Sequence, residues 1–292
     1  MNKYQYLPDE REDFESCMAE IERQRDRVVR SFVDHIEPEA VEAVWTGFRN
    51  TGLHCEHLTV SPEAFRAYVQ DAEYEGRFPD YCNGYRSVLD EKSLEHFIAR
   101  SILDPRESDT LIDLASEHSP LSDIVSRLTG CRAFRQDIMH PPGINGERIG
   151  GDACRMPIPD GFADKITLTC SLEHFEGDSD SRLFVEMYRV LKPGGMVCVV
   201  PFYAFPSAAN QTDPTIGVPN NVPFDSSATI FCAHGWGNRF ARFYSPESFV
   251  KRIAERTGSL FDYTLYRLMN TGAIHSGIYA RFVLLARKRP NT

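Results

Sequence analysis

Between residues 107 and 204, several short apolar runs have the pattern of β-strands, and one longer run repeats its apolar residues at helical spacing. The expected strands are 110–114, 133–136, 148–153, 164–170 and 196–200. The expected helix, 180–191, ends at Lys192-Pro193-Gly194-Gly195, just before the last of these strands. Only about a dozen residues separate 133–136 from 148–153, so no full helix is expected there. Strands that alternate with helices predict an α/β fold with a mostly parallel sheet.

The N-terminal part, residues 1–106, predicts helices only. An apolar stripe from Phe14 to Ile36 indicates a first helix, and Pro38 suits the first turn of a second. Ser61-Pro62 is typical of a capped helix start, and 90–103 predicts a further helix. We therefore expect a helical cap ahead of the α/β core.

The pattern lapses in residues 205–243, which contain four prolines and are too long for an ordinary connection. Such long loops are usually functional, so we expect a lid over the substrate. In residues 244–292 a helix is expected over 245–257, followed by strands at 261–268 and 278–287. The short connection between these two strands suits a hairpin, so we expect an antiparallel pair that completes the core of 107–204.

Composition narrows the function. The chain has 292 residues, is 42% hydrophobic and carries a net charge of -10, which argues against nucleic-acid and anionic-membrane partners. A small-molecule substrate is the better expectation. No apolar stretch is long enough for a membrane span and the first residues lack the apolar core of a signal peptide, so we expect a cytoplasmic protein.

Metal and disulfide chemistry have little support. The eight cysteines contain no CxxC pair, so neither a zinc site nor a disulfide framework is indicated. The string His54-Cys55-Glu56-His57 offers metal-ligand residue types but lacks further spaced partners. We expect no metal, and a metal site at this string remains the alternative.

One segment resembles a known family. Residues 150–200 contain GDA, MPIPDGFAD, LEH and RVLKPGG, and in this order they resemble the later half of class I methyltransferases that use S-adenosylmethionine. The resemblance covers about residues 107–204. It implies a Rossmann-like, seven-stranded, mostly parallel sheet and transfer of a methyl group from S-adenosylmethionine to oxygen or nitrogen of a small molecule, saccharide or lipid precursor.

The loop after the first strand departs from this family. The family usually has a glycine-rich turn here, whereas this chain has Ala115, Glu117 and Ser119 at the three glycine positions. Of these, only alanine is a comfortable replacement. The resemblance still places Asp113, Ala115, Ser116 and Glu117 at the cofactor; a turn that binds no ligand is the alternative.

The other expected cofactor residues follow the next strands. By the resemblance, Asp137 binds the ribose hydroxyls, for which a carboxylate offers several acceptor sites. Asp152 and Ala153 of the GDA match bind the adenine, and Thr169 and Cys170 line the adenosyl pocket. The alternatives are a solvated aspartate at 137 and plain strand packing at 169 and 170.

Methyl transfer mainly requires alignment of a nucleophile and exclusion of water, often with one general base. His234 in the long loop is the preferred base and His174 of LEH, which also suits a structural role, is the second candidate. The expected substrate-binding residues are Tyr203, Trp236, Arg239 and Arg242.

Three alternatives stay open. The chain could be a non-catalytic protein that keeps the fold and serves as a binding or assembly partner, with an altered cofactor loop. A nicotinamide enzyme would need GxGxxG after the first strand, and residues 115–120 contain no glycine. The N-terminal helices could form a homodimer surface instead of enclosing the substrate.

Overall fold

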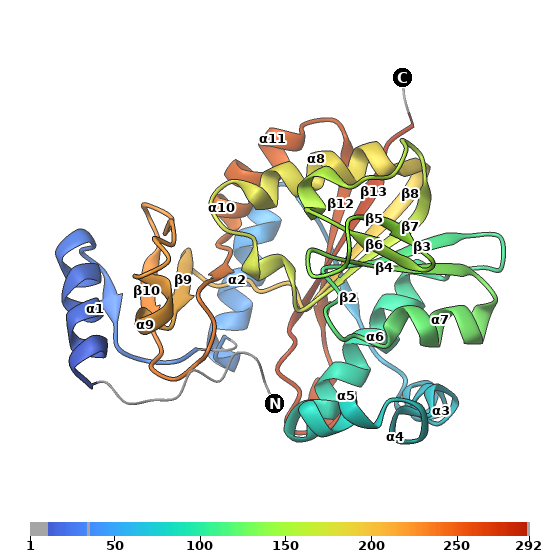
Figure 1. Cartoon of the computed structure of the whole chain (residues 1–292), viewed down its shortest axis with the longest axis horizontal. Helices are drawn as coiled ribbons and strands as arrows, with labels where there is room; N and C mark the ends of the chain where they lie inside the picture. The colour runs from blue at the N-terminus through green and yellow to red at the C-terminus, as the bar shows by residue number, and fades with distance from the viewer. Residues whose placement is uncertain (1–10, 34–35, 291–292) are drawn as a thin grey trace.

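A nine-stranded sheet forms the centre of the computed structural model, which describes residues 11–33 and 36–290 (Figure 1). Listed across the sheet, the strands are β2 (His54–Leu58), β12 (Phe261–Leu268), β13 (Phe282–Lys288), β8 (Leu191–Val200), β7 (Ala163–Thr169), β3 (Thr110–Leu114), β4 (Arg132–Asp137), β6 (Arg148–Gly150) and β5 (Gly143–Asn145). The strand order reverses between β3 and β7, and ligands of open α/β sheets bind at such a reversal.

The expected Rossmann-like fold is confirmed. Pairings along β4, β3, β7 and β8 are parallel, and β13 runs antiparallel to both β8 and β12. The sheet has two edge strands beyond the expected seven: β2, parallel to β12, and β5, antiparallel to β6. The connection from β4 to β6 holds β5 instead of a helix, in agreement with its short length.

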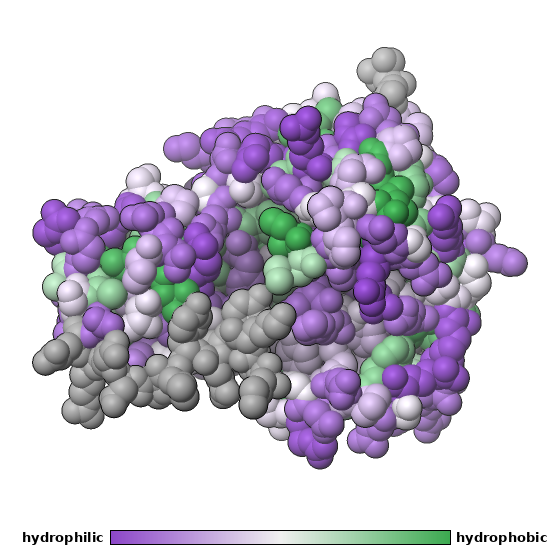
Figure 2. Space-filling model, viewed as in Figure 1, coloured by the Kyte–Doolittle hydropathy of each residue, from purple (hydrophilic) through white to green (hydrophobic). Residues whose placement is uncertain are grey.

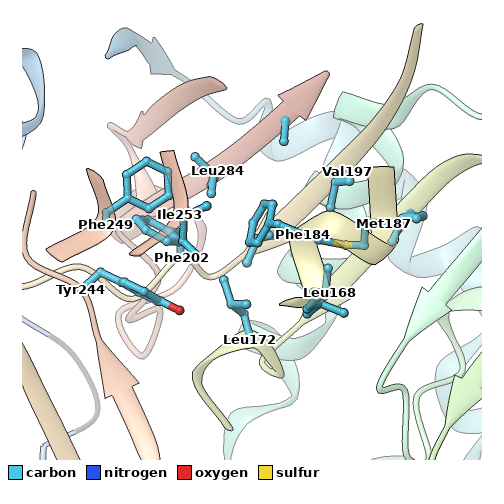
Figure 3. Close-up of a cluster of buried hydrophobic side chains, with 14 of the residues drawn as sticks. Leu168, Leu172, Phe184, Met187, Val197, Phe202, Tyr244, Phe249, Ile253 and Leu284 are labelled. Atoms are coloured by element: carbon cyan, nitrogen blue, oxygen red, sulfur yellow. The ribbon is translucent and has the colours of Figure 1, made fainter. Parts of the chain in front are cut away.

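Helices cover both faces of the sheet, and each face has its own apolar core. The helices on one face are α2 (Pro38–Asn50), α8 (Ser179–Val190), α10 (Pro246–Phe249) and α11 (Glu255–Thr257). Those on the other are α3 (Pro62–Ala72), α4 (Tyr74–Arg77), α5 (Pro79–Gly84), α6 (Leu89–Leu103) and α7 (Leu121–Thr129). On the first face, Phe184 and Met187 of α8 point toward Leu168 and Val197 of the sheet (Figure 3).

The expectation of helices only before residue 107 is wrong at two places. The first helix, α1, spans Arg11–Gln24 and does not continue to Ile36, because Val28–Val29 form strand β1. His54–Leu58 form the edge strand β2, described above. Both strands pair with segments about two hundred residues later in the chain, so local periodicity does not reveal them. The predicted proline starts of α2 and α3 are present, and the Ser61 hydroxyl accepts from the Ala64 backbone N–H.

Residues 205–243 form a small sheet, so the expectation of an unstructured lid loop is wrong. The elements are β9 (Ala209–Thr212), α9 (Pro214–Gly217), β10 (Thr229–Cys232) and β11 (Ala241–Phe243). Strand β1 completes this sheet beside β10, and Met18 and Ile21 of α1 pack on it. We call α1, β1 and residues 205–243 the small lobe; Figure 1 shows much of it beside the main sheet, at the left.

The C-terminal part follows the expectation closely. The strand predicted at 261–268 is β12, and β12 and β13 pair antiparallel. Their connection contains α12 (Thr271–Ile274), a single turn and not a crossover helix. The expected helix 245–257 is present as α10, a π-helical turn at Val250–Ala254, and α11.

The face of the molecule seen in Figure 2 is mostly hydrophilic, with hydrophobic side chains in small patches. Within the described residues, no helix has the length and apolar character needed to cross a membrane.

Candidate functional site

A cavity of about 1300 Å³ lies at the carboxyl ends of the central strands. Its walls come from three parts of the chain: the loops after β3, β4, β6, β7 and β8; the N-terminal region around Phe32, Tyr85 and Lys92; and the small lobe. We call it the central cavity. Of the residues predicted for the site, the cavity is lined by Ala115, Glu117, Asp137, Asp152, Ala153, Cys170, His174, Tyr203, His234, Trp236 and Arg239.

The loop after β3 has the backbone shape of a glycine turn without the glycines. Ala115 has φ 51° and Glu117 has φ 47°, both in the left-handed region. This conformation costs an L-residue roughly 1–2 kcal/mol. It is held by hydrogen bonds, because the N–H groups of Ala115 and Glu117 donate to the side chains of Gln136 at 3.2 Å and Asp137 at 2.8 Å.

Asp113 and Ser116 lie behind this loop and are absent from the cavity wall. The Ser116 hydroxyl bonds the Gln136 carbonyl at 3.3 Å, so it supports the loop. Asp113 is fully buried, and neither of its carboxylate oxygens has a hydrogen-bond partner among the described residues. Burial outweighs the opposing effects of Ser119 and Arg135 and raises the pKa of Asp113 to about 7. Of the four residues expected at the cofactor in this loop, Ala115 and Glu117 line the cavity.

The two expected cofactor carboxylates face the cavity from neighbouring loops. Asp137 is buried and accepts from Glu117 N and from Met139 N, each at 2.8 Å. Asp152 is exposed, and its Oδ1 accepts from Cys154 N at 2.9 Å. A carboxylate has about four acceptor positions, so these bonds leave room for further donors.

Close backbone packing brings these two loops together. A Cβ atom at Gly150 would lie 1.9 Å from the carbonyl oxygen of Pro141, so only glycine fits there. The Gln136 amide donates to the carbonyl of Gly151 at 2.6 Å and joins the β4 loop to the β6 loop. The acidic residues are thereby held on adjacent, connected backbones.

Sequence reasoning missed two apolar residues at this end of the cavity. Ile138 and Met139 are 71% and 67% exposed and line the cavity directly after Asp137. Large apolar side chains are unusual at such exposure on a small polar loop, and a flat aromatic ligand would cover them. The sequence signal that could have identified them is a pair of successive apolar residues directly after the aspartate that ends a strand.

Cys170 lines the cavity, whereas Thr169 does not. Cys170 has φ 46°, also in the left-handed region, and its Sγ donates to Glu95 Oε1 at 3.2 Å. Lys92 Nζ donates to Sγ at 2.7 Å and to Glu95 Oε1 at 3.1 Å. Burial, reinforced by Glu95, raises the pKa of the Cys170 thiol, so it stays protonated.

This Lys92–Glu95–Cys170 group was not predicted. Helix α6 buries three charged residues, Glu91, Lys92 and Glu95, on the sheet side. Charged residues are almost never buried unless paired, and of these three Lys92 lines the cavity. The available signal was that Glu95 lies three residues after Lys92 and four after Glu91, on one face of a helix that must cover the sheet.

The two predicted histidines differ in their surroundings. His174 Nδ1 lies 2.7 Å from the Phe240 carbonyl oxygen, to which it donates, and its ring stacks against Trp236. The Nε2 atom of His174 is 3.8 Å from Glu173 Oε1. The ring of His234 stacks on Phe14 of α1 at 4.4 Å between centroids. Both rings line the cavity, from the main sheet and the small lobe respectively.

Of the two predicted substrate arginines, only Arg239 lines the cavity, where it pairs with Glu176 at 2.6 Å. Arg242 is 1% exposed and pairs with Asp180 at 3.1 Å and Asp225 at 2.7 Å, so its expected substrate role is wrong. It joins the small lobe to α8 instead. Tyr203 lines the cavity with its hydroxyl 3.5 Å from Cys170 Sγ.

The His54-Cys55-Glu56-His57 string lies in edge strand β2, away from the cavity wall. There His54 Nε2 bonds Glu56 Oε1 at 2.6 Å. Within the described part of the chain, no group of three or more His, Cys, Asp or Glu side chains is placed to hold a metal ion.

Comparisons with known proteins address the identity of the fold. The Burkholderia thailandensis 1,6-didemethyltoxoflavin-N1-methyltransferase, solved with 1,6-didemethyltoxoflavin and S-adenosylhomocysteine, is 12% identical; 79% of this chain and 91% of that chain are covered, with a TM-score of 0.48. A protein from Pyrococcus horikoshii is 18% identical, with 75% and 99% covered and a TM-score of 0.44. The Streptomyces coelicolor geranyl diphosphate C-methyltransferase is 12% identical, with 68% and 80% covered and a TM-score of 0.40. No curated protein matches the sequence.

A family profile described as a methyltransferase domain matches residues 129–199. This segment runs from the end of α7 to the end of β8 and includes Asp137, Asp152 and the LEH turn of the cavity wall. The matched segment thus supplies part of the cavity wall, whereas the loop after β3, the N-terminal region and the small lobe lie outside it. This segment of the chain is therefore similar to a methyltransferase domain, as the resemblance of residues 150–200 to class I methyltransferases led us to expect.

Proposed function

We propose that the central cavity binds S-adenosylmethionine and that the protein transfers its methyl group to oxygen or nitrogen of a small molecule. One observation carries the proposal. Asp137 and Asp152 face the same cavity from adjacent loops, with the exposed Ile138 and Met139 following the first of them. A vicinal diol, an aromatic amine and a flat ring are the groups that such a set would bind, and an adenosyl group carries all three.

The residues present fit each part of the cofactor. Asp137 would accept from the ribose hydroxyls, Asp152 from the adenine amino group, and Ile138 would cover the ring. The left-handed residues Ala115 and Glu117 keep the turn open to the methionine part despite their side chains. When bound, the cofactor supplies an electrophilic methyl group on a sulfonium.

The cavity is large enough for a second molecule. Its volume of about 1300 Å³ exceeds the roughly 300–1,000 Å³ of a site for one small ligand. The wall opposite the cofactor residues combines Tyr203, His234, Trp236 and Arg239. We infer that the acceptor lies there, between the N-terminal region and the small lobe, with His234 or His174 available to take a proton.

Mass spectrometry with cofactor carrying a deuterated methyl group tests the proposal. The protein, this cofactor and a small-molecule extract should give products that carry the label. His234→Ala and Arg239→Ala should lower labelling at least about tenfold, the low end for loss of a base or anchor. Both variants should keep their affinity for S-adenosylhomocysteine.

The exposed Arg256 of α11 provides the matched control, because Arg256→Ala removes an equal charge away from the cavity. Full labelling in the His234 and Arg239 variants would exclude their role at the acceptor. Cofactor binding without any labelled product would favour the non-catalytic binding protein.

A further inference from the structure

The charges on the cavity wall are strongly one-sided. Among the residues that the structure describes, seven carboxylates and two cations line it. The carboxylates are Asp13, Glu117, Asp137, Asp152, Glu173, Glu176 and Asp213, and the cations are Lys92 and Arg239. A low-dielectric cavity with this excess of negative charge attracts cations.

Neither cation is available to hold an anionic acceptor. Lys92 lies 3.1 Å from Glu95, which is almost fully buried, and it also donates to Cys170. Arg239 pairs with Glu176 at 2.6 Å. Binding of a carboxylate or phosphate here would require one of these pairs to break. An anionic acceptor is therefore disfavoured in the cavity.

Glu173 differs from the other carboxylates on the wall. It follows β7 in the short helical turn Leu172–His174, and only 6% of its surface is exposed. Its Oε2 has no hydrogen-bond partner among the described residues. An unpaired buried carboxylate oxygen is costly, and Glu173 is among the residues that line the cavity, from which a ligand could supply the missing donor.

The surroundings of Glu173 suit a protonated amine. The other oxygen of this carboxylate, Oε1, lies 3.8 Å from His174 Nε2. Burial, opposed by His174 and Lys92, raises the pKa of Glu173, which makes it a better proton acceptor. Aromatic residues Tyr85, Tyr203 and Trp236 line the same cavity, and aromatic faces attract cations.

We propose that the methyl acceptor is a small amine, bound as its ammonium ion with one N–H donated to Glu173 Oε2. This inference rests on the proposed function, because it assigns the acceptor of the same cavity. It narrows the choice of oxygen or nitrogen to nitrogen and the acceptor to a cationic molecule with an apolar or aromatic body.

The proton inventory of the step balances. The ammonium gives one proton to Glu173 Oε2, and the neutral amine then has a lone pair. That lone pair forms the new N–C bond to the methyl carbon while the S–C bond breaks and its electron pair stays on sulfur. The product is a methylated ammonium and the neutral thioether, and Glu173 returns its proton to water when the product leaves.

A pair of probes with opposite charge tests the inference. Tyramine and 3-(4-hydroxyphenyl)propionate share a phenol ring and differ in an ammonium or a carboxylate at the end of the chain. Titration of each probe into the protein, with and without saturating S-adenosylhomocysteine, should show tyramine binding at least about tenfold more tightly. Equal or tighter binding of the propionate, or binding of neither probe at millimolar concentration, would overturn the inference.

Two variants locate the effect. Glu173→Gln keeps the shape of the side chain and should reduce the preference for tyramine to within about twofold. Asp123→Asn removes a carboxylate that pairs with Arg135 outside the cavity wall, and it should leave the preference intact. An unchanged preference in Glu173→Gln would exclude Glu173 as the anchor. If Glu173→Gln does not fold, the wild-type comparison decides alone.

Failure of this inference and failure of the proposed function are separate outcomes. S-adenosylhomocysteine is titrated alone in the same series and reports only on the cofactor end of the cavity. Cofactor binding with no amine preference would leave the methyltransferase proposal standing and reject the amine. An amine preference without cofactor binding would reject the methyltransferase proposal, and with it the role of the amine as methyl acceptor, and would leave only an amine-binding site at Glu173.

Discussion

The backbone N–H of Glu117 donates to Asp137 Oδ2 at 2.8 Å. This bond joins the left-handed turn after β3 to the carboxylate at the end of β4. One side chain therefore holds the loop and, under the proposed function, would also accept from the ribose hydroxyls. This loop keeps its shape by bonding to a neighbouring carboxylate, whereas a glycine-rich turn reaches the same shape through conformational freedom.

The first prediction concerns Asp137. Asp137→Ala should weaken binding of S-adenosylhomocysteine by about 1.5–3 kcal/mol, the scale of hydrogen bonds to a charged group. Asp137→Asn keeps one acceptor oxygen and should therefore weaken the binding of S-adenosylhomocysteine less than Asp137→Ala does. Asp123→Ala is the control, because Asp123 of α7 pairs with Arg135 of β4 and does not line the cavity. Calorimetric titration gives the affinities; equal affinity in Asp137→Ala and wild type would contradict the assignment.

The second prediction concerns the strained turn. Ala115→Gly relieves a left-handed conformation at a cost of roughly 1–2 kcal/mol but adds unfolded-state entropy of roughly 0.5–1 kcal/mol. We expect the free energy of unfolding to rise by up to about 1 kcal/mol in urea denaturation, with cofactor affinity retained. Ala115→Val should lower both the free energy of unfolding and the cofactor affinity, because a β-branched residue at φ 51° is more strained. Loss of binding in the glycine variant would show that this turn is not the cofactor loop.

The third prediction separates Arg242 from Arg239. Arg242 is buried between Asp180 and Asp225, so Arg242→Ala leaves buried carboxylates short of a partner and should cost about 3–5 kcal/mol in the free energy of unfolding. Arg239 is half exposed, and Arg239→Ala should change that free energy by about 1 kcal/mol or less. Thermal and urea unfolding measure both. A stable, fully folded Arg242→Ala protein would contradict the structural role.

The fourth prediction is a pH dependence of stability. In the unfolded chain Asp113 ionises near pH 3.8, whereas in the folded protein burial raises its pKa to about 7. Between these values the folded state holds a proton that the unfolded state has lost, so stability falls as pH rises through this window. Glu91, with its pKa raised to about 8 by burial, acts in the same direction.

Urea denaturation at about pH 5 and about pH 8 measures this slope. Asp113→Asn should reduce the loss on going to the higher pH by at most about 3 kcal/mol, since about two units separate pH 5 from the folded pKa and each corresponds to about 1.4 kcal/mol. The remaining slope should persist because of Glu91. A slope that is unchanged in Asp113→Asn would show that Asp113 has an ordinary pKa in the folded state.

Local sequence signals predicted the main sheet well. Strand β12 spans the predicted 261–268, and β3 spans the predicted 110–114. The helix predicted at 180–191 is α8, displaced by one residue. These segments form because each buries an apolar face of its own, so their periodicity is visible within the segment.

Other features depend on partners far away in the sequence. Strand β1 is two residues long and forms only beside β10, so Phe14 to Ile36 looked like one helix. Arg242 looked like a solvent-exposed lid residue because its partners, Asp180 and Asp225, belong to other elements. For the same reason the sequence does not identify Glu173 as a site residue. Only the structure reveals that its Oε2 is buried without a partner among the described residues.

Calorimetric titration of the folded wild-type protein with S-adenosylhomocysteine tests the central claim most directly. The account predicts saturable binding of one molecule per chain, weakened in Asp152→Ala by about 1.5–3 kcal/mol and unchanged in Asp160→Ala, whose carboxylate pairs with Arg189 outside the cavity wall. No heat with S-adenosylhomocysteine or with S-adenosylmethionine, on protein whose fold is verified by circular dichroism, would contradict the claim that this cavity is a cofactor site.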